Sequence, residues 1–341
     1  MNIGIIGINH KSAALRLREK LAIEAEHLFG PRYAAHFRLS YILLSTCNRT
    51  ELYFHSDDLA MTHTYLLNAI RERMEEEFEH KIYSYFGIDC FFHLARVTAG
   101  VDSALIGETE IQGQVKRAYE MAHSYRTLAP ELHFLFQKCL KIGKEVRSQH
   151  RLAYGLPCIE NAVLNVGMRI LGNLQEKNVL FVGLSEINHK IFLHLKKIGC
   201  RHLFFCNRTL SKAQELAAKE NIGFLPWEQL DRWSSFDAVI FGTKCPHFLI
   251  HKEDVISPSA CRLVIDLSVP RNVDPKIGRH PEITLLNVDQ LNRAIDRKRT
   301  IKATEIARIE THLIAQSVER QAALFQIKEL QRSHFALSTA V

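Results

Sequence analysis

The chain has 341 residues, of which 47% are hydrophobic and 24% are charged. This length is enough for two or three domains with their own cores, and the composition is that of a globular protein. No apolar run approaches the roughly 20 residues that a membrane helix needs, so we expect no membrane segment and a cytoplasmic location. The formal net charge of +7 permits contact with a polyanion without indicating one.

Eight cysteines are spread over the chain without a C-x-x-C pair, a pattern that argues against a disulfide framework and against a zinc ribbon. We expect most of them to be small buried hydrophobic residues and at most one or two to be chemically special. Cys245, His247 and His251 lie close in sequence, but two of their spacings are those of residues on one side of a strand. We therefore expect no metal site.

The first part of the chain predicts an α/β domain whose second half is helical. In chain order, the predicted elements are a buried strand at 3–8, a helix at 18–27, short strands at 41–45 and 51–55, and helices from about 58 to 151. Breaks near Gly87, Gly100 and Pro130 divide the helical part. We expect this domain to cover residues 1–154.

Glycine and proline at 155–157 interrupt the helical pattern and mark the first domain boundary. Beyond it, strands alternate with helices, and the strands are expected at 178–182, 202–206, 237–241 and 263–267. This alternation predicts a parallel, doubly wound sheet in a Rossmann-like domain over residues 155–287.

The sequence after Pro281 contains no glycine or proline and is rich in helix-forming residues. It predicts one long helix over residues 288–341. A helix of this length cannot bury its apolar face on itself. We therefore expect its first half to pack on the preceding domains and its far end to pack on a second copy of the chain.

A candidate dinucleotide loop follows the strand at 178–182 and opens a helix. The loop reads Gly183, Leu184, Ser185, Glu186, Ile187, Asn188, so only the first glycine of G-x-G-x-x-G is present. On this pattern alone, a plain turn between strand and helix is an equally good interpretation. A nucleotide phosphate would lie at the N-terminus of the helix.

Asn207, Arg208 and Thr209 follow the next strand, at the place where an acidic residue would hold the ribose of NAD. No carboxylate is present there to repel a 2′-phosphate, and Arg208 can pair with one, which favours NADPH. The same residues also fit a helix cap, with Thr209 or Asn207 at the N-cap position. The two interpretations are compatible.

Cys47 lies in a polar turn between two strands, close to Arg49. An exposed cysteine near positive charge has a stabilised thiolate and can act as a nucleophile. With NADPH, such a thiolate would form a thioester with an activated acyl group, and hydride would reduce the thioester to an aldehyde. Acyl esters and acyl phosphates both fit this chemistry. A turn cysteine in a loop that Arg49 holds together is the structural alternative.

Five motifs resemble the glutamyl-tRNA reductase family, and the resemblance covers roughly residues 1–330. They are GINHKSA (7–13) with REKL (18–21), STCNRTE (45–51), HLARV with GVDS (93–103), GETEIQGQVK (107–116) and DLSVPRNVDP (266–275). The resemblance implies an enzyme that reduces glutamyl-tRNA(Glu) with NADPH to glutamate-1-semialdehyde, the first step of five-carbon tetrapyrrole biosynthesis.

The resemblance also assigns roles to single residues. It implies that Cys47 is the nucleophile, and that His93 polarises the carbonyl or relays a proton. Arg49 would grip the side-chain carboxylate of glutamate, while acidic groups would meet its α-ammonium. The substrate site would be lined by Thr46, Cys47, Asn48, Arg49, Ser103, Glu108, Thr109, Glu110 and Gln114. The cofactor would lie on residues 183–188.

The chain departs from the family pattern in several places. Two glycines of the nucleotide loop are missing, and Ala14 and Thr109 stand where the family has proline. The family usually continues past the long helix into a helical dimerisation domain, so we expect a homodimer that is weaker than in longer relatives. The resemblance also suggests glutamate-1-semialdehyde aminotransferase as a partner.

Other functions remain open. An NADP-dependent semialdehyde or small-molecule dehydrogenase would use the same cysteine without tRNA. A catalytically eroded relative would bind RNA or sense the redox state. Residues 114–151 carry eight Lys or Arg against three Glu, which suits contact with tRNA and equally suits a solvated helix face.

Overall fold

The computed structural model describes residues 1–32, 39–104, 110–149, 158–254, 262–296 and 308–338. The chain forms two compact units. The first unit comprises Met1–Leu156 and Thr300–Val341, and the second unit comprises Pro157–Arg299. Within the described ranges, no helix is long and apolar enough to cross a membrane.

The first unit is built on a four-stranded antiparallel sheet with the strand order β2-β3-β1-β4. The strands are β1 (Ile3–Asn9), β2 (Ser40–Ser45), β3 (Arg49–His55) and β4 (Tyr83–Phe86). The first three correspond to predicted strands. The fourth was expected to be helical, and it is a four-residue edge strand without fully buried side chains, so its sequence carries no strand pattern.

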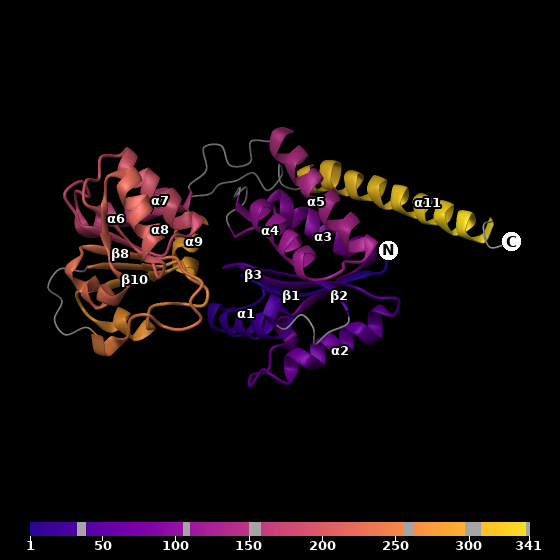
Figure 1. The fold of residues 1–341 in the computed structure, drawn as a ribbon, viewed down its shortest axis with the longest axis horizontal. Helices are drawn as coiled ribbons and strands as arrows, with labels where there is room; N and C mark the ends of the chain where they lie inside the picture. The colour runs from indigo at the N-terminus through magenta and orange to yellow at the C-terminus, as the bar shows by residue number, and fades with distance from the viewer. Residues whose placement is uncertain (33–38, 105–109, 150–157, 255–261, 297–307, 339–341) are drawn as a thin grey trace. The chain divides into compact units, whose positions relative to one another are not determined.

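Helices cover both faces of this sheet (Figure 1). On one face lie α1 (Leu15–Phe29) and α2 (Leu59–Arg71), and on the other lie α3 (Gly87–Ala99), α4 (Glu110–Tyr125) and α5 (Pro130–Gln149). The alternation of β1 explains the two layers, because Ile3 and Ile5 face the core of α3 to α5 while Ile6 and Ile8 face the core of α1 and α2.

The C-terminal helix packs on the first unit. It begins with a π-helical segment, η6 (Ile309–Ala315), and continues as α11 (Gln316–Ser338). Ile309, Ile314 and Val318 are buried in the same core as α3 and α5, and the ring of Phe325 lies 4.8 Å from that of Phe134. Beyond Phe325 the described apolar side chains are exposed, and α11 extends away from the sheet (Figure 1).

The second unit is a six-stranded parallel sheet with the order β10-β9-β8-β5-β6-β7, which confirms the predicted doubly wound fold. Its strands are β5 (Val179–Val182), β6 (Leu203–Cys206), β7 (Gly223–Leu225), β8 (Ala238–Phe241), β9 (Leu263–Asp266) and β10 (Thr284–Asn287). The short edge strands β7 and β10 were not predicted, because their residues are largely half-buried or exposed.

The central strands of this sheet are buried on both faces. On one face, Phe181 packs edge-on against Phe192 of α7 (Glu186–Lys197). On the other, Leu180 and Val182 share a core with Trp233 of the 3-10 segment η3 (Trp227–Ser235). The remaining helices are α6 (Ile159–Leu171), α8 (Leu210–Glu220) and α9 (Val288–Asp296).

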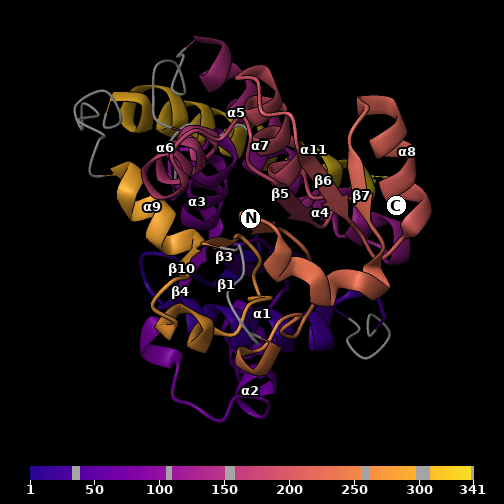
Figure 2. The same ribbon diagram turned by 90° about the vertical axis from the view of Figure 1, so that its left-hand side faces the viewer.

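The segment predicted as one helix over 288–341 is divided between the two units. Its first part, α9, lies beside α6 in the second unit (Figure 2), whereas η6 and α11 belong to the first. Residues 297–307 are outside the described ranges. The absence of glycine and proline permits a helix at every position of this segment. It does not show that one part of the segment packs in the second unit and the other part in the first.

Candidate active site

Cys47 lies at the tip of a tight β-hairpin. Only Thr46, Cys47 and Asn48 lie between the end of β2 and the start of β3, and Ser45 pairs with Thr50 across the strands. The Thr46 hydroxyl accepts hydrogen bonds from the backbone N–H groups of Asn48 and Arg49, both at 3.2 Å, and so closes the turn. The Cys47 side chain is partly exposed at this tip, as a nucleophile requires.

Other segments hold the loop from outside the hairpin. Arg18 of α1, itself buried, donates from its guanidinium to the Cys47 carbonyl at 2.7 Å. The backbone N–H of His10 donates to the Asn48 carbonyl at 2.9 Å. Burial, followed by the charges of Arg49 and Lys11, lowers the pKa of His10 to about 4. His10 is therefore neutral at physiological pH.

A buried ion network lies next to the loop. One Arg49 nitrogen donates to Glu51 at 2.7 Å, and the other donates to the Asp102 carbonyl at 2.6 Å and to its carboxylate at 3.1 Å. Lys11 also binds the Asp102 carboxylate, at 2.6 Å. Burial alone would raise the pKa of Asp102, but Arg49 and Lys11 outweigh it and hold that pKa below its ordinary value.

Glu51 is the centre of this network and is fully buried. Its carboxylate accepts hydrogen bonds from the hydroxyls of Tyr53 and Tyr83, at 2.7 and 2.6 Å, and lies 2.9 Å from Nε2 of His93. Burial would raise the pKa of Glu51, but Arg49 and then His93 hold it well below its usual range. The His93 ring is thus fixed by an ionised carboxylate, an arrangement typical of an oriented acid or base.

Arg49 is paired within the protein, and its predicted contact with a substrate carboxylate stays a prediction. Its guanidinium was expected to grip a substrate carboxylate, but its hydrogen bonds go to Glu51 and Asp102 and its side chain is 1% exposed. In this conformation Arg49 holds the hairpin from behind. A substrate carboxylate would reach it only by displacing one of the protein's own carboxylates.

Other predicted substrate residues carry polar atoms that lack a hydrogen-bond partner among the described residues. They are Oδ1 of Asn48 and Oγ of Ser103, both in buried side chains, and they are joined by Nδ1 of His10. Buried polar groups normally have partners, so such atoms mark a place where a ligand can bind. Glu110 and Gln114 lie one turn apart on α4, which packs against β2, while Glu108 and Thr109 are outside the described residues.

The sequence reasoning did not assign Arg18, Glu51, Asp102 or Tyr83 to the site. Arg18, Glu51 and Asp102 stand inside three of the family-like motifs, and that position was the available signal. Arg18 reads as one more charged residue of an amphipathic helix. Only the fold shows that it reaches the carbonyl of Cys47.

In the second unit, residues 183–188 form the turn after β5 and the first residues of α7. The backbone at Gly183 lies close to Gly242, which follows the end of β8. Gly183 has a φ of +91°, and a Cβ there would lie 2.5 Å from the carbonyl oxygen of Gly242. Glycine is therefore required at position 183, and a Cβ at Gly242 would in turn lie 2.6 Å from Oγ of Ser185. Ser185 caps α7, because its hydroxyl accepts from the Asn188 N–H at 3.3 Å.

Asn188 stands where the third glycine of the dinucleotide motif is expected. Its side chain is fully buried, and its amide donates to the carbonyls of Val182 and Gly183 at 3.0 and 2.9 Å. The missing glycine is thus replaced by a side chain that ties the helix to the strand. The loop keeps its shape without the full glycine motif.

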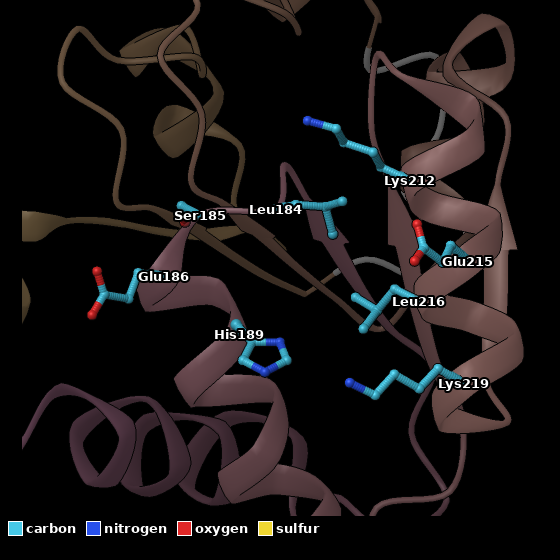
Figure 3. A pocket seen from close by; sticks show the side chains of 8 residues that line it. All are labelled: Leu184, Ser185, Glu186, His189, Lys212, Glu215, Leu216 and Lys219. Atoms are coloured by element: carbon cyan, nitrogen blue, oxygen red, sulfur yellow. The ribbon is translucent and has the colours of Figure 1, made fainter. Parts of the chain in front are cut away.

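A pocket of about 490 Å³ opens between α7 and α8, a size that suits part of a dinucleotide (Figure 3). Its lining residues are Leu184, Ser185, Glu186, His189, Lys212, Glu215, Leu216 and Lys219. Arg208 is exposed beside the start of α8, where Thr209 holds the N-cap position but its side chain makes no capping hydrogen bond. Lys212 and Lys219 add positive charge that was not predicted. These residues fit a phosphorylated nucleotide.

A mixed cluster of possible metal ligands also lies in this unit. His251, Glu253 and Asp274 bring ligand atoms within 4.8 Å of one another, whereas Cys245 Sγ contacts only His247 Nε2 among these candidates, at 3.3 Å. Exposed groups of this kind are common without an ion. We assign no metal to them.

The two units together define a class of protein. A partly exposed cysteine at the tip of a hairpin, and a Rossmann-like sheet with a dinucleotide-type loop, are features found in nucleotide-dependent oxidoreductases. A family model described as "Glutamyl-tRNAGlu reductase, N-terminal domain" matches residues 6–150. A second, described as "Shikimate / quinate 5-dehydrogenase", matches residues 165–294 and implies a nicotinamide nucleotide cofactor.

Relatives named glutamyl-tRNA reductase align over most of the chain. Those of Carboxydothermus hydrogenoformans and Deinococcus radiodurans are 31% and 33% identical, covering 92% and 86% of this chain and 74% and 84% of the relatives. That of Akkermansia muciniphila is 30% identical, covering 94% of this chain and 97% of the relative. The solved glutamyl-tRNA reductase of Methanopyrus kandleri is 27% identical, covering 97% of this chain and 81% of that one, with a TM-score of 0.49. The chain belongs to the glutamyl-tRNA reductase family.

Proposed function

We propose that this protein reduces the glutamyl group of glutamyl-tRNA(Glu) to glutamate-1-semialdehyde, the first step of five-carbon tetrapyrrole biosynthesis. The observation that carries the proposal is the placement of Cys47. A partly exposed thiol stands at the tip of a three-residue hairpin, backed by a buried charge network, in a chain of this family. Such a loop presents a nucleophile without letting it move.

The proposed reaction has two stages. The Cys47 thiolate attacks the ester carbonyl of the charged tRNA, the terminal ribose hydroxyl leaves, and a thioester forms. NADPH, when bound, supplies the hydride that converts the thioester carbonyl into an aldehyde. The carbon–sulfur bond breaks in this stage, and Cys47 is regenerated as a thiolate.

We assign the proton transfers to His93. Its Nε2 is held by the Glu51 carboxylate, so the ring orientation is set before substrate arrives. In this role His93 would donate a proton to the leaving ribose hydroxyl or polarise the carbonyl. Thr46, Asn48, Ser103, Glu108, Thr109, Glu110 and Gln114 would line the glutamate pocket, with Arg49 as the support of the hairpin.

The direct test uses the full chain with labelled glutamyl-tRNA and NADPH. Wild type is expected to release labelled aldehyde. Cys47→Ser is expected to release none, because the serine hydroxyl stays un-ionised and is a weak nucleophile, and an alkoxide is a poor leaving group. Without NADPH, wild type should accumulate a thioester or hydrolyse the charged tRNA slowly. Cys245→Ser, which changes a partly exposed cysteine of the second unit, is the matched control.

The outcomes separate the proposal from its competitors. Full activity of Cys47→Ser would falsify the thioester mechanism. Turnover of small acyl phosphates with no reaction of charged tRNA would indicate a small-molecule dehydrogenase instead. A folded protein that binds RNA but neither binds nor oxidises NADPH would indicate an eroded relative.

We further propose NADPH rather than NADH as the cofactor. Arg208 at the N-terminal end of α8 and Lys212 in the adjoining pocket supply positive charge for a 2′-phosphate. Arg208→Ala is expected to reduce the preference for NADPH, measured as kcat/KM with both cofactors, by about ten- to a hundredfold. Equal use of the two cofactors by wild type would refute this assignment.

We propose that the protein forms a homodimer. We also propose that its aldehyde product passes directly to a second enzyme. The far end of α11 exposes apolar side chains, which a second copy of the chain would cover. The product is a reactive α-amino aldehyde, so glutamate-1-semialdehyde aminotransferase is the proposed partner that would receive it. Both proteins would act in the cytoplasm, where charged tRNA is made.

A further inference from the structure

One ion pair joins the C-terminal helix to the end of α3. Nε of Arg96, in the last turn of α3, donates to a carboxylate oxygen of Glu310 in the π-helical segment η6, at 2.8 Å. The two side chains are 29% and 25% exposed. Pairs this accessible add little to stability, so the position of this one is of more interest than its strength.

Arg96 also faces Asp102 of the catalytic network. Gly100 ends α3 in the left-handed conformation, and the chain folds back so that the Val101 and Asp102 N–H groups donate to the Arg96 carbonyl at 3.0 and 3.4 Å. The second contact is between side chains, with NH2 of Arg96 3.7 Å from the Asp102 carboxylate. Helix termination therefore fixes Asp102 beside Arg96.

Three cations share the one carboxylate of Asp102. Arg49 and Lys11 make the short contacts, at 3.1 and 2.6 Å, and Arg96 makes the long one. The guanidinium of Arg96 is turned towards Glu310, which explains its greater distance from Asp102. The charges alternate from Glu310 through Arg96, Asp102 and Arg49 to the carboxylate that orients His93.

We propose that Glu310 is a positioning residue for the catalytic loop, acting through Arg96. Glu310 pairs with Arg96, so that Asp102 stays paired with Arg49 and Lys11. The contact with Asp102 in turn keeps Arg49 in the position from which it supports the Cys47 hairpin. Without the Glu310 charge, Arg96 is drawn to Oδ1 of Asp102, the oxygen that Lys11 also binds. The pull on this carboxylate weakens its contact with Arg49, which is made through Oδ2. The C-terminal helix thereby adjusts the reaction of the first unit. This inference rests on the proposed function.

A simpler role would be docking alone, in which the ion pair only helps to attach the helix. The apolar contacts of η6 and α11 already provide attachment, since Ile309, Ile314 and Val318 are buried in the core. Docking alone predicts that any change that loosens the helix slows the enzyme. Positioning predicts that removal of the charge slows it while the helix stays attached.

The experiment compares full-length variants in a single turnover. Glu310→Gln removes the charge, and Glu310→Asp retains it on a shorter side chain. Glu120→Gln is the matched control, because Glu120 pairs with Lys116 at 3.5 Å on the exposed face of α4 in the same unit. Phe325→Ala loosens the helix by a cavity without changing charge. The rate of glutamyl transfer to Cys47 without NADPH, the KM for NADPH and the Tm are measured for each.

Glu310→Gln is expected to slow transfer about three- to tenfold, with the Tm and the KM for NADPH unchanged. Glu310→Asp should recover most of the rate, and Glu120→Gln should match wild type. Phe325→Ala should lower the Tm and transfer normally at a temperature where it is folded. Transfer by Glu310→Gln at the wild-type rate, or an equal slowing by Phe325→Ala, would overturn the inference. Failure of wild type to transfer glutamate would instead overturn the proposed function.

Discussion

At the scale of single residues, the site depends on a glycine whose role is steric. Gly7 of β1 lies opposite Glu51 of β3 and Tyr83 of β4 in the sheet register. A Cβ at Gly7 would lie 2.8 Å from Cγ of Glu51 and 3.1 Å from the Tyr83 ring. The missing side chain is what lets these two residues meet above the strand and form their hydrogen bond. The centre of the ion network therefore requires glycine at this position.

We expect Gly7→Ala to lower the free energy of unfolding of the first unit by about 1–3 kcal/mol, because the added methyl group overpacks a buried polar contact. Hydrogen exchange of β1 and β3, followed by mass spectrometry, measures the loss. The matched control is Gly113→Ala in α4, where a Cβ meets nothing closer than the mobile end of Arg117 at 3.4 Å. That change should stabilise the helix by about 0.5–1 kcal/mol. Equal protection in Gly7→Ala and wild type would contradict the steric account.

At the scale of elements, the loops after β8 and β9 are tied together by buried polar groups. Asn272 is fully buried, and its amide donates to the carbonyls of Cys245 and His247 at 3.0 and 3.1 Å. Asp266 at the end of β9 accepts from the N–H groups of Ser268 and Asn272 at 3.0 and 2.8 Å. The carboxyl edge of the parallel sheet, where nucleotides bind in this fold, is thus shaped by buried hydrogen bonds.

Asp266 predicts a pH dependence of stability. Burial raises the pKa of Asp266 to about 6, even though three backbone N–H donors oppose the rise. The folded state therefore holds this proton more tightly than the unfolded state. The stability due to this group is complete below pH 4 and is lost as the pH rises through about 6, by on the order of 3 kcal/mol.

The comparison is between wild type and Asp266→Asn, which cannot titrate. Urea unfolding from pH 4 to 7 should show wild type losing stability relative to the variant, with the difference constant above pH 7. Tryptophan fluorescence reports this unit alone, because both tryptophans of the chain, Trp227 and Trp233, lie in η3. A relative gain in wild-type stability over this range would show that the backbone donors outweigh burial.

The contacts of α4 and α5 also show what several basic side chains of residues 114–151 do in the fold. Arg126 donates to the Leu39 carbonyl and lies 3.3 Å above the ring of Tyr41, and Arg147 donates to the Thr98 carbonyl. Lys116 and Lys141 form ion pairs one turn along their own helices. Much of the positive charge therefore serves the fold or is locally balanced, and contact of this surface with tRNA stays a prediction.

At the scale of the whole molecule, the C-terminal helix has two different halves. The half up to Phe325 is attached to the first unit by buried apolar contacts. Large apolar side chains become exposed from Leu324 onwards, where Leu324, Ile327 and Leu330 are 44%, 50% and 62% accessible. Three exposed large apolar side chains within seven residues are unusual for a helix that stays in water. A second copy of the same helix is the partner we propose for this part.

Association should therefore depend on these side chains. We expect the double variant Ile327→Gln and Leu330→Gln to weaken self-association by about tenfold or more, because each change removes apolar area from a contact. Sedimentation equilibrium over a concentration series measures it. Met168→Gln, at a residue 55% exposed on α6, is the control for a general loss of surface hydrophobicity. A wild-type protein that is monomeric at every concentration, with its helix folded, would defeat the proposal.

The sequence by itself determined the features that depend on neighbouring residues. The alternation of strands and helices predicted the parallel sheet, and the polar turn around Cys47 predicted its hairpin, because both are set by local conformational preference and patterning. Edge strands such as β4 and β10 escaped prediction, since strands that are not buried carry no apolar pattern.

Tertiary structure alone decided how the site is held together. Arg49 reads in the sequence as a cation available to a substrate, and the fold surrounds it with Glu51 and Asp102. Arg18 reaches Cys47 across 29 residues, and Glu310 reaches Arg96 across 214. The energy of such contacts depends on distance and burial in three dimensions, and neither quantity is contained in the order of residues along the chain.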